Sequence, residues 1–202
     1  ASDLTAIVPH TRFVSYLEGG EMAVITPEGA LFSDLNGAAL SKALTRAPAD
    51  QISAAKGSYK HFMLKEINEQ PEAVVNTLRG RVSFDSGRVQ LGELSITDDD
   101  LRDINRVVLI GMGTSLHAAM VGRMWIEKLA KLPAEVDNSS EFRYRDPVID
   151  EKTLVISICQ SGETADTLAA MSEAESKGAR QITLSNHEGA QTTRIADATL
   201  QL

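Results

Sequence analysis

The chain has 202 residues, of which 43% are hydrophobic and 24% charged, and it carries a formal net charge of −8. This length is enough for one sizeable core, or for one domain with an appendage. The acidic balance argues against a general nucleic-acid-binding surface. No apolar run approaches the roughly 20 residues that span a bilayer, so no membrane association is expected.

Two further observations concern the setting of the chain. The start at Ala1 shows no signal peptide, and the single cysteine excludes an internal disulfide, so we expect a cytoplasmic protein. The chain lacks a starting Met and ends on a predicted strand without a covering helix. Both observations suggest a piece of a longer protein.

Residues 1–45 alternate short apolar runs with turn signals. The runs at 12–17, 22–26 and 31–35 predict short strands, and the intervening glycine-containing turns favour antiparallel hairpins. Three short strands are too few for an independent domain. We therefore interpret this region as the edge of something larger.

Residues 46–90 are predicted to be a linker with connecting helices. Residues 46–58 show little periodicity, whereas apolar residues recur at helical spacing over 59–79. Pro71 lacks the N–H that a position inside a helix needs. We therefore predict one helix ending near Glu69 and a second from Pro71 to Arg79, with proline as the first helical residue.

Residues 91–202 alternate strands with helices. The predicted strands are 106–110, 133–136, 153–158, 181–184 and 199–202. Helices are predicted to start at 98, 114, 163 and 190, with a helical turn at 139–142. This alternation predicts an α/β fold, a parallel sheet with helices on both faces. The Met and Trp residues of helix 114–132 have helical spacing and are expected in the core.

Two turns of small polar residues follow predicted strands, at Gly111–Ser115 and Cys159–Thr164. Ligands of parallel sheets bind beyond the carboxyl ends of the strands. The N–H groups at a helix start are unpaired and carry positive partial charge, so each turn is suited to an anion. The alternative is helix capping by Ser and Thr alone. Two such turns favour a shared anionic ligand, although neither a complete dinucleotide fingerprint nor a nucleotide P-loop is present.

Three blocks of sequence resemble the glucosamine-6-phosphate synthase family. They are Gly113-Thr114-Ser115, Ser140-Glu141-Phe142-Arg143-Tyr144-Arg145 and Gln160-Ser161-Gly162-Glu163-Thr164-Ala165-Asp166-Thr167. Upstream, residues 59–71 resemble the segment that joins the two halves of these enzymes. The resemblance implies that residues 1–45 are the tail of a glutaminase type 2 domain. It also implies that 46–90 are a linker and 91–202 a first sugar isomerase (SIS) domain of flavodoxin-like fold, incomplete at its C-terminus.

The resemblance also implies a function and a site. Enzymes of this family transfer the nitrogen of glutamine to fructose 6-phosphate and isomerise the product to glucosamine 6-phosphate. The site of this chain would bind the phosphosugar, as fructose 6-phosphate or glucosamine 6-phosphate. The residues implied are Gly113, Thr114, Ser115, Cys159, Gln160, Ser161 and Thr164.

Cys159 departs from the family, which usually has Ser at this position. A thiol is a weak hydrogen-bond donor, so the resemblance supports a ligand contact less well here. The alternative interpretation is a small buried residue at the end of a strand.

The resemblance places the chemistry outside this chain. The family's glutamate base, ring-opening histidine and imine-forming lysine lie in a second SIS domain and a C-terminal tail, and the glutaminase cysteine lies further upstream. We therefore expect no catalytic residue, no metal and no cofactor here, and no activity from this piece alone. Glutamine would bind through the missing glutaminase domain, and the family implies a homodimer. The alternative function is a non-catalytic phosphosugar-binding SIS module, as in some regulators.

The remaining candidates have structural interpretations. Glu163 is expected to be an acid in the first turn of the helix that follows it rather than a base. Arg143 and Arg145 could approach an anionic ligand or pair with Glu141 and Asp146, and structural pairing or a subunit contact is the favoured interpretation. His117 is expected to be a surface or packing residue, and the other histidines lack the spacing of metal ligands.

Overall fold

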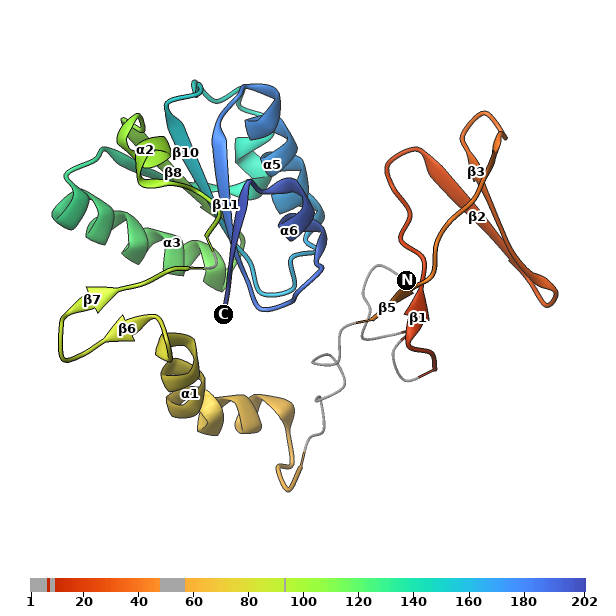
Figure 1. Cartoon of the computed structure of the whole chain (residues 1–202), viewed down its shortest axis with the longest axis horizontal. Coiled ribbons are helices and arrows are strands. Elements are labelled where there is room, and N and C mark those ends of the chain that lie inside the picture. Colours follow the sequence, from red (N-terminus) through yellow and green to blue (C-terminus); the bar gives the residue numbers. More distant parts are fainter. Residues whose placement is uncertain (1–6, 8–9, 48–56, 93) are drawn as a thin grey trace. The chain divides into compact units, whose positions relative to one another are not determined.

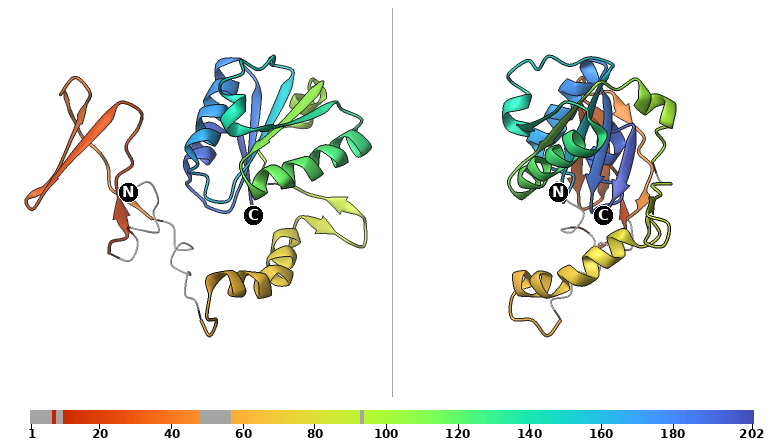
Figure 2. Two further views of the ribbon diagram at one scale, coloured as in Figure 1. Left: turned by 180° about the vertical axis from the view of Figure 1, so that it is seen from behind. Right: turned by 90° about the vertical axis from the view of Figure 1, so that its left-hand side faces the viewer.

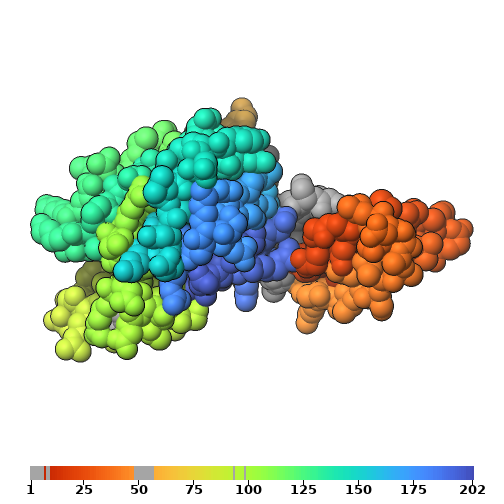
Figure 3. All heavy atoms as spheres, turned by 90° about the horizontal axis from the view of Figure 1, so that it is seen from above, coloured from red at the N-terminus to blue at the C-terminus, as the bar shows by residue number. Residues whose placement is uncertain are grey.

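The computed structural model describes residues 7, 10–47, 57–92 and 94–202. They divide into two compact units, the first within residues 1–55 and the second within 56–202 (Figure 1). Figure 3 shows the atoms of the first unit in red to orange and those of the second in yellow to blue. Among these described residues, no helix has the length and apolar character that a bilayer crossing requires.

The first unit contains two small antiparallel sheets. One has the order β2-β3-β4 and the other pairs β1 with β5. Their bounds are β1 (Phe13–Val14), β2 (Glu21–Thr26), β3 (Gly29–Asp34), β4 (Ala39–Leu40) and β5 (Thr45–Arg46). The predicted hairpin of the strands at 22–26 and 31–35 is confirmed as β2 and β3, whereas the strand predicted at 12–17 shrinks to β1. Ile25 and Leu31 of this hairpin are 82% and 71% exposed, so the described part of the unit has little core of its own.

The second unit begins with helix α1 (Phe62–Leu78), and the predicted break at Pro71 is wrong. Pro71 lies inside one continuous helix, where it leaves the carbonyl of Ile67 without its usual donor. Ile67 is half exposed, so water can bond that carbonyl and the helix continues. Within the predicted linker region 46–90, most of the stretch without periodicity, at 48–56, lies outside the described residues. After α1, an unpredicted hairpin pairs β6 (Val82–Ser83) with β7 (Arg88–Val89).

The core of the second unit is a five-stranded sheet in the order β12-β11-β10-β8-β9, with every neighbouring pair parallel (Figure 2). The bounds are β8 (Arg106–Gly111), β9 (Ala134–Asn138), β10 (Thr153–Ile158), β11 (Arg180–Ser185) and β12 (Ala198–Gln201). The predicted parallel sheet is thereby confirmed. Central strands of such sheets are covered on both faces, which explains the continuous apolar run of β10.

Helices cover both faces of the sheet, as predicted. They are α2 (Asp98–Arg102), α3 (Thr114–Trp125) with a π-helical extension η3 (Ile126–Ala130), α4 (Ser139–Phe142), α5 (Ala165–Ser176) and α6 (Gln191–Ile195). Side chains of β8 alternate between the faces. Val107 and Leu109 join one apolar cluster with Ala119 of α3, while Val108 and Ile110 join another with α4 and α5.

Helix α3 corrects the prediction that its Met and Trp residues are core. Met120, Met124 and Trp125 are 50%, 66% and 63% exposed, and only Ala119 of this helix is buried. The helix instead approaches the sheet through small residues. A Cβ at Gly122 would lie 3.0 Å from a methyl group of Leu109. The large side chains therefore lie on the opposite side of the helix.

Candidate functional site

The two polar turns leave the same edge of the sheet from adjacent strands. β8 and β10 are parallel neighbours, and Gly111 at the end of β8 pairs with Ile158 at the end of β10. The carboxyl ends of these strands therefore bring Gly111–Ser115 and Cys159–Thr164 together. This is the arrangement that one small ligand contacting both turns requires.

The first turn is tight because it contains two glycines. Gly113 has a φ of +55°, a left-handed conformation that glycine adopts without strain. A Cβ at Gly111 would lie 3.0 Å from the backbone carbon of Ser115, closer than ordinary contacts allow. The chain therefore doubles back directly from β8 into α3, and Thr114 becomes the first helical residue.

Several hydrogen-bond donors of the first turn are accessible to a ligand. Gly113 and Thr114 are exposed and Ser115 is half-buried. Gly113 occupies the N-cap of α3, which therefore has no side-chain cap, and neither hydroxyl has a hydrogen-bond partner in the described part of the chain. Within that part, the N–H of Thr114 also has no backbone acceptor. Capping by Thr114 or Ser115 is therefore not their role at this helix start.

The second turn ends where α5 begins, at Ala165, two residues later than predicted. Thr164 is the N-cap residue, yet its side chain makes no capping hydrogen bond. The Ser161 hydroxyl accepts the N–H of Glu163 at 3.3 Å, which leaves its own proton available to a ligand. No backbone acceptor within the described residues bonds the N–H groups of Ser161, Gly162 and Thr164.

Gln160 is the exposed member of the second turn. Its side-chain nitrogen lies 3.4 Å from Nε2 of His187, a long contact that holds the amide weakly. Its carbonyl accepts the N–H of Asn186 at 3.3 Å. The backbone of Gln160 is thus fixed by the loop after β11, while its side chain remains free to turn toward a ligand.

Cys159 is directed into the protein. Its side chain is 5% exposed, and the sulfur lies 3.2 Å from the carbonyl oxygen of Leu184. Its N–H donates to the same carbonyl at 3.0 Å. The thiol and the backbone donor are both occupied within the protein. The structure therefore favours the interpretation of Cys159 as a small buried residue that supports the turn.

Glu163 does not lie in the first turn of its own helix, so that expectation is wrong. Its carboxylate accepts the backbone N–H of Gln191 at 2.9 Å and also the Gln191 side-chain amide. Gln191 is the first residue of α6, so Glu163 is an acid at the start of a different helix. The cause is the later start of α5, which leaves Glu163 in the turn.

The Ser140–Arg145 block is structural in the described chain. The predicted pairing of these arginines with Glu141 and Asp146 is wrong. Arg143 pairs with Asp166 at 3.3 Å, and Arg145 pairs with Asp137. Helix α4 is a single turn, so these long side chains reach back to β9 and across to α5. Asp146 does not pair with these arginines but accepts a hydrogen bond from Lys177, which lowers the pKa of the Asp146 carboxyl. The block thereby fastens α4 to the first turn of α5.

Several supporting residues were not predicted. Fully buried Thr167 of α5 donates its hydroxyl to Ser139, 3.3 Å away, and buried Thr192 of α6 lies 3.5 Å from the sulfur of Cys159. Thr167 follows the second turn in the same strand–helix unit but bonds a residue of α4, whereas Thr192 belongs to the next unit. Thr167 lies in the third block of the family resemblance, but no local pattern predicted either contact, because the partners are 28 and 33 positions apart in sequence. His117 is exposed at the first turn of α3, as expected for a surface residue.

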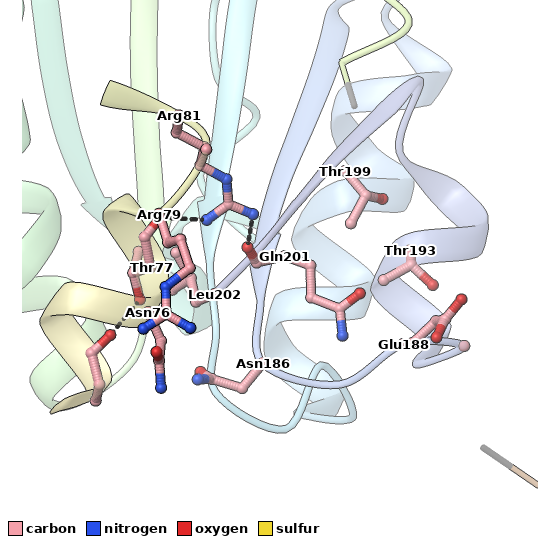
Figure 4. A pocket seen from close by; sticks show the side chains of 13 residues that line it. Asn76, Thr77, Arg79, Arg81, Asn186, Glu188, Thr193, Thr199, Gln201 and Leu202 are labelled. Atoms are coloured by element: carbon pink, nitrogen blue, oxygen red, sulfur yellow. Dashed lines mark hydrogen bonds between the residues drawn. The ribbon is translucent and has the colours of Figure 1, made fainter. Parts of the chain in front are cut away.

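A separate cavity of about 930 Å³ lies at the C-terminal end of α1 (Figure 4). Its walls include Asn76, Arg79, Asn186 and Gln201, and none of the predicted site residues lines it. Arg81 donates to the carbonyls of Thr77, at 2.9 Å, and Gln201, and so ties the end of α1 to β12. The two turns therefore lie outside the walls of this cavity.

Comparison with known proteins identifies relatives of the chain. The SIS domain family matches residues 100–202. A glutamine–fructose-6-phosphate aminotransferase (isomerizing) of Caldanaerobacter subterraneus is 46% identical over 200 residues, which are 99% of this chain and 33% of that protein. The protein of the same name from Clostridium acetobutylicum is 46% identical over 197 residues, 98% of this chain and 32% of that protein. The chain thus spans about a third of the length of these curated relatives.

A solved structure agrees with these relatives. The C-terminal domain of glucosamine-fructose-6-phosphate aminotransferase from Francisella tularensis is 37% identical and superimposes with a TM-score of 0.67. The match covers 73% of this chain and 42% of that chain.

Proposed function

The chain belongs to the SIS domain family, and on this premise we propose that it is the phosphosugar-binding part of a glutamine–fructose-6-phosphate aminotransferase, a transferase. The observation that carries the proposal is the pair of turns at one sheet edge. The Thr114 and Thr164 hydroxyls make no capping bond. The N–H groups without a backbone acceptor in the described chain are those of Thr114, Ser161, Gly162 and Thr164, and these groups remain available to an anion. The ligand we propose is fructose 6-phosphate, with glucosamine 6-phosphate as the product bound in the same place.

In this proposal the phosphate lies between the two helix starts. No Lys or Arg lies in either turn, so N–H groups and hydroxyls hold the dianion. The exposed Gln160 amide is placed to bond a sugar hydroxyl. Gly113 allows the backbone to approach the phosphate closely. Cys159 is buried and supports the turn without contacting the ligand. The proposed contacts are Gly113, Thr114, Ser115, Gln160, Ser161 and Thr164, with Cys159 supporting them.

The chemistry in this proposal comes from other parts of a longer protein. Moving a proton between sugar carbons needs a base within hydrogen-bond reach. The acid within the second turn and the acid in the first turn of α5 are both occupied, because Glu163 is bonded to Gln191 and Asp166 to Arg143. We therefore place nitrogen transfer and isomerisation on residues outside this chain. The same proposal makes residues 1–45 the end of a glutaminase domain and residues 46–90 a linker. It also places the protein in the cytoplasm, as a homodimer.

The occupied acids also favour a second candidate, a phosphosugar-binding module without chemistry. One experiment separates the two functions. The full-length protein that contains this chain is titrated calorimetrically with fructose 6-phosphate and with fructose, and is assayed for glucosamine 6-phosphate formation from glutamine. We expect binding of the phosphorylated sugar only, together with product formation. Binding without product supports the second candidate, and absence of binding contradicts both.

A further inference from the structure

A carboxylate lies within the turn that is proposed to bind a phosphate dianion. Glu163 stands between Gly162 and Thr164, whose N–H groups have no backbone acceptor in the described chain. Like charges a few ångströms apart repel strongly in a partly desolvated site. A free Glu163 carboxylate would therefore oppose the ligand that the turn is built to hold.

The first residue of α6 holds this carboxylate. One oxygen of Glu163 accepts the backbone N–H of Gln191 at 2.9 Å, and the other accepts its side-chain amide. Both oxygens are thus directed toward Gln191. Hydrogen bonds to a charged acceptor are stronger than neutral ones, and the N–H at a helix start suits a negative charge.

The same end of α6 fixes the apex of the turn. The N–H of Thr192 donates to the carbonyl of Gly162 at 3.2 Å. A Cβ at Gly162 would lie 2.5 Å from Cβ of Ala190 and 2.6 Å from the hydroxyl oxygen of Thr192. The turn and the start of α6 are therefore packed without space for one methyl group.

We propose that Glu163 and Gln191 are positioning residues for phosphosugar binding. The α6 clamp, defined as the Glu163–Gln191 and Gly162–Thr192 contacts, directs the donors of the second turn outward and holds the Glu163 charge away from the phosphate. This inference rests on the proposed function. A purely structural role would not depend on the charge of Glu163. The positioning role predicts that loss of Gln191 weakens phosphosugar binding through that charge.

Three variants of the full-length protein test the inference by titration with fructose 6-phosphate. Gln191→Ala removes the side-chain donor but leaves a charged Glu163, and we expect about tenfold weaker binding, with an unchanged KM for glutamine. Adding Glu163→Gln to Gln191→Ala removes the charge as well, so at least threefold of the affinity returns. Gln90→Ala, at an exposed position outside the clamp, leaves the affinity unchanged.

The outcomes distinguish failure of the inference from failure of the proposed function. If the wild-type protein binds the phosphosugar and Gln191→Ala binds it equally well, the inference is wrong and the proposed function stands. A double variant that binds no better than Gln191→Ala shows a structural role only, and also overturns the inference. If the wild-type protein binds no phosphosugar, the proposed function fails and takes the inference with it.

Discussion

The two turns that start α3 and α5 leave adjacent strands, yet they are held in different ways. The first turn is shaped by its own backbone, through Gly111 and the left-handed Gly113, and its residues Gly113 and Thr114 are exposed. The second is packed against α6, and its backbone and Glu163 carboxylate bond residues of the following unit. The difference indicates that local sequence shapes the first turn and tertiary contacts shape the second. Variants can test this contrast.

The largest effect is expected for Gly162→Ala. The residue has a φ of +67° and no room for a Cβ, which would lie 2.5 Å from Ala190. Strain and overpacking together predict a loss of about 3 kcal/mol in the free energy of unfolding, measured by denaturant titration. Gly178→Ala is the matched control, since Gly178 has a φ of +78° with nothing within 4 Å. Equal losses in the two variants would contradict packing of the second turn against α6.

Gly113→Ala tests the first turn by the same measurement. The φ of +55° is unfavourable for alanine, but no atom lies within 4 Å of the new Cβ. We therefore expect a loss of about 1 to 2 kcal/mol from backbone strain alone. A loss as large as that of Gly162→Ala would remove the contrast between the turns.

Hydroxyl removal tests the use of both turns by one ligand. Thr114→Val and Thr164→Val each delete a hydroxyl that makes no capping bond. We expect each to weaken fructose 6-phosphate binding by roughly tenfold, about 1.4 kcal/mol, with the free energy of unfolding unchanged. Calorimetric titration and denaturant unfolding measure the two quantities. A variant that loses stability without losing affinity would show that its hydroxyl caps the helix and does not bind the ligand.

The smallest effect is expected for Cys159→Ser, which introduces the residue usual in the resembling family. The side chain at this position is buried beside the Leu184 carbonyl, which a hydroxyl can also bond. We expect phosphosugar affinity within about twofold of wild type and a stability change below about 1 kcal/mol. A tenfold gain in affinity would mean that this side chain reaches the ligand.

Much of the fold was predictable because its signals are local. The apolar run of 153–158 predicted β10, and the alternation of strands and helices predicted the parallel sheet. Errors occurred where a residue's environment is set by distant parts of the chain. Pro71 lies inside a continuous helix at a position where the residue that loses its donor, Ile67, is half exposed and within reach of water. Met120 and Trp125 are exposed because small residues bring α3 onto the sheet.

The sequence by itself determined where both turns lie, since small polar residues after apolar strands are a pattern within a few neighbouring positions. Only the tertiary structure decided which groups of the second turn face outward. The thiol and N–H of Cys159 bond Leu184, and the carboxylate of Glu163 bonds Gln191, 28 positions later in the chain. Such contacts arise from the packing of one strand–helix unit against the next, which no periodicity in the sequence encodes.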